Sequence, residues 1–163
     1  MNTAIKPQAE KKTAQSFRLR TALLKEGRTH RILASAKGEA GAMNVAIKCY
    51  AHGGENEFHT HAIEDHTFIV LQGRARFQQP DLPDIEVGRN EGVLLPAGAY
   101  YKFEAVPGEP LVLLRVGNVW QPLEGEVTVN ASRRLGKNGE ALHSHSAENK
   151  HVEPVAIPGA FYE

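Results

Sequence analysis

Short apolar segments separated by Gly and Pro, at intervals of roughly ten residues, fill the middle of this chain. They are residues 43–50, 66–71, 74–78, 85–87, 92–95, 100–105 and 111–116. Each segment is shorter than a typical helix. Several are rich in β-branched residues or alternate between apolar and polar residues, which favours strands. Many short strands with frequent turns are typical of a sandwich or a closed barrel. We therefore predict an all-β domain.

Both faces of some expected strands are apolar. Phe68 and Val70 would share one face of their strand, and Ile69 and Leu71 would share the other. A strand with one face in the core must then have its outer face covered as well. A second subunit would cover it, so we expect a homodimer.

The chain divides into three parts. Residues 1–16 are polar and rich in lysine, and we expect a flexible N-terminal arm. Residues 17–120 hold the expected barrel, although 17–32 fits a strand pair or a short helix equally well. Residues 121–163 are polar with an apolar end, and we expect this C-terminal extension to pack on the barrel or on a second subunit. With 163 residues, one domain is expected.

Charge and composition narrow the partners. Lys plus Arg and Asp plus Glu both number 19, so the formal net charge is zero and no long-range attraction to nucleic acid or acidic membranes is expected. No apolar run approaches the roughly 18 residues of a membrane-spanning helix. The single cysteine, Cys49, cannot form an internal disulfide. These features favour a cytoplasmic protein that acts on a small molecule.

Three histidines carry the expected chemistry. His59 and His61 are two residues apart, so on a strand their rings project to the same side. A turn over residues 62–65 would bring His66 beside them on a neighbouring strand. Converging imidazoles bind Zn, Fe, Ni, Cu or Mn, and three of them leave positions open for water or substrate. The sequence therefore predicts one divalent metal ion on His59, His61 and His66.

The stretch from Gly53 to Gly73 resembles the first sequence motif of the cupins, in which Gly, His-x-His, Glu and Gly follow at set spacings. Gly53, His59, His61 and Gly73 match this pattern. His66 stands where the motif has Glu, and Asp65 is the near alternative. Because His66 shares a strand face with Phe68 and Asp65 does not, His66 is the preferred ligand.

The second cupin motif is matched in part. Pro96 and Gly98 fit it, whereas Tyr101 stands where the fourth ligand, a histidine, is usual. The resemblance covers about residues 43–117 and implies a double-stranded β-helix, also called a jelly-roll barrel. It also implies a metal site that lacks the usual glutamate and last histidine.

These departures shape the expected site. Tyr101 is the candidate catalytic residue, and its phenol could bind the metal as phenolate or donate a hydrogen bond to substrate. We prefer the hydrogen bond, since a phenol near its ordinary pKa of about 10 stays protonated at neutral pH unless the metal stabilises its charge. A site without a carboxylate has a larger net positive charge, which favours an anionic substrate. Further candidates for substrate contact are Phe68, Phe103, Arg76 and Arg115.

The resemblance leaves several functions open. Three-histidine cupins imply a dioxygenase-like enzyme with ferrous iron, acting on a small organic acid or an enolisable carbonyl compound. The same site with Zn, Ni or Mn fits a redox-neutral isomerase, decarboxylase or lyase. A non-catalytic cupin that binds a small ligand is the remaining alternative.

Overall fold

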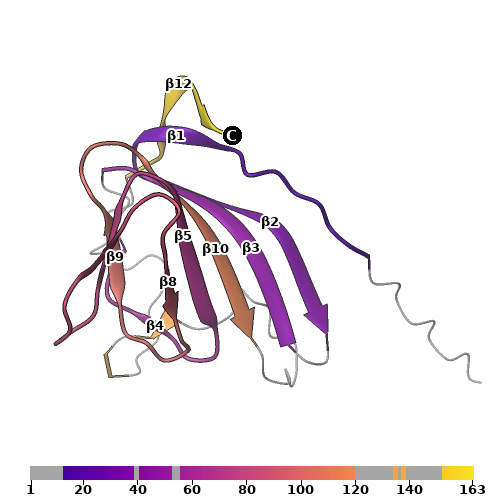
Figure 1. Ribbon diagram of the computed structural model, residues 1–163, viewed down its shortest axis with the longest axis vertical. Coiled ribbons are helices and arrows are strands. Elements are labelled where there is room, and N and C mark those ends of the chain that lie inside the picture. The colour runs from indigo at the N-terminus through magenta and orange to yellow at the C-terminus, as the bar shows by residue number, and fades with distance from the viewer. Residues whose placement is uncertain (1–12, 39–40, 53–55, 120–133, 136, 139–151) are drawn as a thin grey trace, which may run out of the picture.

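The larger of two facing sheets has five antiparallel strands. The computed structural model describes residues 13–38, 41–52, 56–119, 134–135, 137–138 and 152–163 (Figure 1). In order across the sheet the strands are β2 (Arg28–Gly38), β3 (Gly41–Tyr50), β10 (Leu111–Val119), β5 (Asp65–Gln72) and β8 (Gly92–Leu95). Strands distant in sequence are neighbours here, so the sheet is held by long-range pairing.

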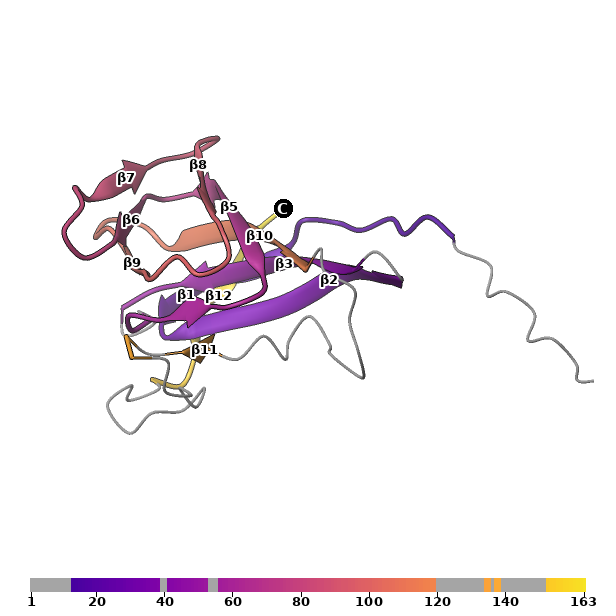
Figure 2. The ribbon, with the colours of Figure 1, turned by 90° about the horizontal axis from the view of Figure 1, so that it is seen from below.

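The smaller sheet lies across the barrel from part of the larger one, as Figure 2 shows. It has three antiparallel strands, in the order β7 (Ile85–Val87), β6 (Ala75–Gln78) and β9 (Lys102–Ala105). The described residues contain no helix. This architecture confirms the prediction of a single all-β domain with a jelly-roll, double-stranded β-helix barrel.

The main core lies between the two sheets. Alternation along β5 turns His66, Phe68 and Val70 inward, where all three are buried. Side chains from both sheets pack around Phe68, including Phe77 and Phe103 with ring centroids 5.5 and 5.3 Å away. His66 lies on the same strand face as Phe68 and Val70, so it is positioned by the packing of this core.

A second apolar cluster covers the outer face of β3 and β10. It contains Leu24, Ile47, Cys49, Ala51 and Val112, with partly buried Leu19, Leu23, Leu33, Leu71 and Tyr162 against them. Leu24 belongs to β1 (Thr21–Glu26) and Tyr162 to β12 (Val155–Tyr162), which pair antiparallel with each other. The chain's own end strands therefore cover the apolar face at these positions, where the sequence suggested a second subunit.

Residues 17–32 contain β1 and the start of β2, and these two strands do not pair with each other. β1 pairs with β12 and β2 pairs with β3. Gly27 separates them with a φ of 75°, and a Cβ there would lie 2.5 Å from the carbonyl oxygen of Val152. The close approach of that backbone and the left-handed conformation both favour glycine.

The strand β4 (Thr60–His61), which contains His61, lies at the end of the barrel opposite β1 and β12 in Figure 1. There β4 pairs with β11 (Arg134–Leu135), and His59 forms an isolated bridge with Tyr101. Gly53, most of the expected N-terminal arm and much of the C-terminal extension lie outside the described residues. Among the described residues, none belongs to a helix long and apolar enough to span a membrane.

Candidate metal centre

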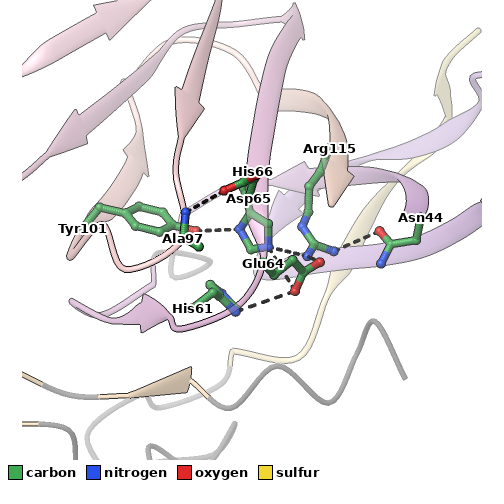
Figure 3. Close-up of polar contacts among 8 residues, drawn as sticks. All are labelled: Asn44, His61, Glu64, Asp65, His66, Ala97, Tyr101 and Arg115. Carbon is green, nitrogen blue, oxygen red and sulfur yellow. Dashed lines mark hydrogen bonds and ion pairs between the residues drawn. The ribbon is translucent and has the colours of Figure 1, made fainter. Parts of the chain in front are cut away.

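His66 points into the barrel from β5, whereas its neighbour Asp65 does not. The His66 residue is only 2% exposed. Asp65 accepts a hydrogen bond of 2.7 Å from the backbone N–H of Ala97, and so ties β5 to the loop after β8 (Figure 3). Of the two alternatives for the position, it is His66 that reaches the interior.

A carboxylate joins the histidines at the site. Glu64 Oε2 lies 3.2 Å from His66 Nε2 and 3.9 Å from His61 Nδ1. One ligand atom from each of these three residues lies within 4.8 Å of those of the other two. We call His61, Glu64 and His66 the His-Glu-His cluster (Figure 3).

His59 does not belong to this cluster. Its Nδ1 lies 2.7 Å from the backbone oxygen of Glu57, and its ring packs on Tyr101 with centroids 4.6 Å apart. The ring centroid is 5.1 Å from that of His61. The structure therefore brings together two of the three expected histidines, with Glu64 as the third member, and leaves His59 beside them.

The sequence motif does not predict Glu64, because its spacing admits only positions 65 and 66 for the third ligand. Glu64 follows His61 by three residues and lies in the turn before β5, where strand alternation says nothing about direction. The residue type of Glu64 nevertheless offers a clue to its role. A glutamate between two ligand candidates, followed by an inward arginine on another strand, indicates a buried ion pair.

Arg115 is that arginine, and it fixes Glu64. The Arg115 residue is 5% exposed, and its Nη2 donates to Glu64 Oε1 at 2.5 Å and contacts His66 Nε2 at 2.6 Å. Its Nη1 donates to Asn44 Oδ1 at 3.2 Å. The two carboxylate oxygens are thus divided: Oε1 faces the guanidinium and Oε2 faces the histidines. Such an outer partner orients a metal ligand.

Gly117 makes space for this ion pair. It lies between Asn44 and His66 in the row of residues that crosses β3, β10 and β5. A Cβ at this position would lie 2.1 Å from Glu64 Oε1 and 2.8 Å from Arg115 Nη2. Any side chain here would therefore displace Glu64 or Arg115.

Tyr101 holds the other side of the His66 ring. Its hydroxyl lies 3.1 Å from His66 Nδ1, and the Tyr101 residue is 2% exposed. Burial lowers the pKa of His66 below its ordinary value; the hydrogen bond that the charged ring would give Glu64 opposes that shift, and the charge of Arg115 adds to it. His66 is therefore neutral near pH 7. With a guanidinium donor at Nε2, the proton is on Nδ1 and points to the Tyr101 oxygen.

The remaining candidates separate into two groups. Phe68 and Phe103 are each 1% exposed and form the apolar wall below His66, whose ring centroid is 5.8 Å from that of Phe68. Arg76 lies on the other face of β6, where it pairs with Glu86 and Glu104 at 3.5 and 3.1 Å. The structure therefore does not bring Arg76 to the site.

The donor set of the cluster fits a divalent transition metal. Two imidazoles and one carboxylate are a ligand set that Fe(II), Zn and related ions accept, typically at about 2.0–2.2 Å. Ligand atoms at such bond lengths are about 3 Å apart, close to the 3.2 and 3.9 Å distances in the cluster. A metal would compete with Arg115 for the lone pair of His66 Nε2, while Glu64 could keep Arg115 on its other oxygen.

Comparisons with known proteins agree with this architecture. The family model for the cupin domain matches residues 46–117. A protein with a double-stranded β-helix domain from Klebsiella pneumoniae is similar in structure, with a TM-score of 0.50 and 14% identity over 60% of this chain and 81% of that one.

Two more solved structures are similar over a comparable extent. A cupin superfamily protein from Desulfitobacterium hafniense has a TM-score of 0.48 and 15% identity, over 56% of this chain and 77% of that one. KdgF from a Halomonas species has a TM-score of 0.48 and 15% identity, over 60% and 82%. Among curated proteins, none matches the sequence significantly. Residues 46–117, which match the cupin-domain model, include the whole His-Glu-His cluster together with Tyr101 and Arg115, and this part of the chain is a cupin domain.

Proposed function

We propose that this protein is a metal-dependent cupin enzyme that acts on a small organic acid or an enolisable carbonyl compound, with dioxygenase-like chemistry as the leading case. The His-Glu-His cluster is the observation that carries the proposal. Two histidines and one carboxylate with open positions form the ligand set of non-haem Fe(II) oxygenases. The same residues accept Zn, Ni or Mn, which would suit an isomerase, a decarboxylase or a lyase.

Charge at the cluster supports an anionic substrate. A bound divalent ion would supply a Lewis acid, or with iron a centre that activates oxygen. Glu64 and Arg115 carry opposite charges and compensate each other at 2.5 Å. Because Arg115 already neutralises Glu64, the protein would leave most of the positive charge of the ion uncompensated. The net charge of the site would then resemble that of a site with three histidines and no carboxylate. An enolate or a carboxylate would supply the missing negative charge.

The residues around the cluster would orient the reactants. Tyr101 holds His66 through Nδ1, which fixes the ring and leaves Nε2 as the ligand atom. Phe68 and Phe103 close the floor of the site with apolar surface and exclude water from it. Arg115 keeps Glu64 in place through Oε1.

The test combines metal content with turnover. Protein purified without added metal should contain about one transition-metal ion per chain, measured by elemental analysis. Iron-loaded protein should consume oxygen with at least one member of a panel of 2-oxo acids, 2-hydroxy acids and 1,3-dicarbonyl compounds. His61→Ala should abolish both properties, whereas His52→Ala, outside the cluster, should preserve them. Turnover that survives His61→Ala would contradict the proposal.

The contact between Arg115 and His66 favours a second candidate, a non-catalytic cupin that binds a small ligand. In the structure the guanidinium takes the Nε2 lone pair that a metal would need. A binding module of this kind should hold no metal, should form no product with any member of the panel, and should keep its ligand affinity in His61→Ala.

A further inference from the structure

Asn44 is a buried polar residue at the edge of the site, on the side of Arg115 away from His66 (Figure 3), and the proposed metal chemistry does not use it. It projects from β3 to the inner face, directly opposite Gly117 on β10, and is 2% exposed. Its Oδ1 accepts the hydrogen bond from Arg115 Nη1. Within the described part of the chain, its Nδ2 has no hydrogen-bond partner.

A buried amide that donates no hydrogen bond is uncommon, because the lost bonds to water cost free energy. The orientation of this amide is fixed by its neighbour. Arg115 can only donate, so the oxygen of Asn44 must face the guanidinium and the NH₂ group must face away from it. A flip of the amide would place two donors against each other. The unmatched donor is thus a consequence of the Arg115 contact.

Arg115 has unused donors as well. A guanidinium carries five N–H groups. The contacts with Glu64, His66 and Asn44 use both N–H groups of Nη2 and one of Nη1. One N–H of Nη1 and that of Nε take no part in these contacts. Asn44 and Arg115 therefore present several donors beside the cluster, and no acceptor is described for them.

We propose that Asn44 and Arg115 form a subsite that binds the carboxylate of the substrate next to the His-Glu-His cluster. The inference rests on the proposed function, since it names the group of the substrate that these residues hold. A carboxylate accepts hydrogen bonds through both oxygens and donates none, which matches a set of buried donors. A charged acceptor also forms stronger bonds to a guanidinium than a neutral carbonyl does.

The test observes the Asn44 amide directly in metal-free protein, so it does not depend on activity. Metal is removed with a chelator, which is then dialysed away because it is itself a carboxylate. The side-chain NH₂ signals of Asn44 are followed by ¹H–¹⁵N NMR as sodium acetate is added, against sodium chloride at equal ionic strength. Acetamide serves as the neutral probe of the same shape. The Asn44 signals are identified by their absence in Asn44→Asp.

Acetate should shift the Asn44 signals in a saturable manner, and acetamide should not. Asn44→Asp replaces the donor with a carboxylate oxygen and should weaken acetate binding at least about tenfold, equivalent to about 1.4 kcal/mol. Asn90→Asp makes the same charge change at an exposed turn and should bind acetate as the original protein does. If Asn44→Asp does not fold, Asn44→Ala removes the same donor without adding charge.

Three results would overturn the subsite. In the first, acetate leaves the Asn44 signals unchanged, which would indicate that the amide binds only an ordered water. In the second, acetamide shifts the signals as much as acetate does. In the third, Asn44→Asp binds acetate with the affinity of the original protein. Failure of the proposed function would look different, because the protein would then bind acetate at Asn44 and yet take up no metal at the cluster.

Discussion

Glu64 and Arg115 are the two residues on which the geometry of the site depends. Both are almost fully buried and contact each other at 2.5 Å, with Asn44 and His66 as further partners of Arg115. A buried charge is costly unless it is paired, so each residue is tolerated because of the other. The same pairing directs one carboxylate oxygen towards His61 and His66.

Glu64→Met should lower the free energy of unfolding by about 3–5 kcal/mol, because Arg115 is then buried without its counter-charge. The double variant Glu64→Met with Arg115→Met removes both charges and should recover most of that loss. Urea unfolding of the metal-free proteins measures both values. Losses that simply add in the double variant would show that the two residues do not stabilise each other.

Gly117→Ala should disturb Glu64 while leaving the barrel folded. The new methyl would overlap Glu64 Oε1, so the carboxylate must turn away from the histidines. Metal affinity, measured by competition with a chromogenic chelator, should fall about 10–100-fold. Gly88→Ala is the matched control, because a Cβ there would make an ordinary contact of 3.4 Å. Unchanged affinity in Gly117→Ala would contradict the assigned role of Glu64.

The sequence predicted part of this site, for identifiable reasons. The spacing of the first motif and the alternation along a strand both indicate His61 and His66, and the structure places these two side chains close together. Glu64 was missed because it lies in a turn and one position away from the spacing considered. Asn44 carried no signal at all, since its role depends on the register between β3 and β10, which pairs it with Gly117.

At the scale of elements, β1 and β12 are the strands that complete the outer side of the barrel. They pair with each other and place Leu24 and Tyr162 on the outer face of β3 and β10. The short strands of the middle region were predictable from Gly and Pro positions. The pairing of β1 with β12 was not, because it joins residues more than a hundred positions apart with no local pattern linking them.

Leu24→Ala should cost about 2–5 kcal/mol of unfolding free energy, since Leu24 is 2% exposed and its removal leaves a cavity beneath β1. Leu82→Ala is the control for the same chemical change at a 58% exposed position, where a change within about 0.5 kcal/mol is expected. Thermal or urea unfolding gives both values. Equal costs for the two variants would mean that β1 does not seal this face.

The reactivity of Cys49 gives a second test of whether β1 and β12 cover the outer face of β3 and β10. It is fully buried in the outer cluster, and burial raises the pKa of its thiol above the ordinary value of 9.0. A raised pKa means less thiolate at any given pH, and the thiolate is the reactive form. The native protein should therefore react with DTNB very slowly at pH 8, and rapidly in urea. Rapid reaction of the native protein would show that the cover is open.

At the scale of the whole molecule, the barrel positions the cluster by joining distant segments. The turn after β4 supplies Glu64, β5 supplies His66, β10 supplies Arg115, and the residues before β9 supply Tyr101. On β5 and β10, the alternation of side chains directs His66 and Arg115 inward. These side chains meet only when the strands are assembled in the barrel, so the site depends on the complete fold. The homodimer stays a prediction. The apolar outer face suggested it, but β1 and β12 of the same chain already cover part of that face.

The central claim is that His61, Glu64 and His66 meet around one metal ion, and anomalous diffraction tests it most directly. Crystals grown with Fe(II) or Co(II), and measured at the absorption edge of that metal, should show one strong peak inside the barrel. It should lie about 2.0–2.2 Å from a nitrogen of His61, a nitrogen of His66 and an oxygen of Glu64. A peak only at surface histidines, or Arg115 still bonded to His66 in metal-soaked crystals with no peak beside it, would contradict the account.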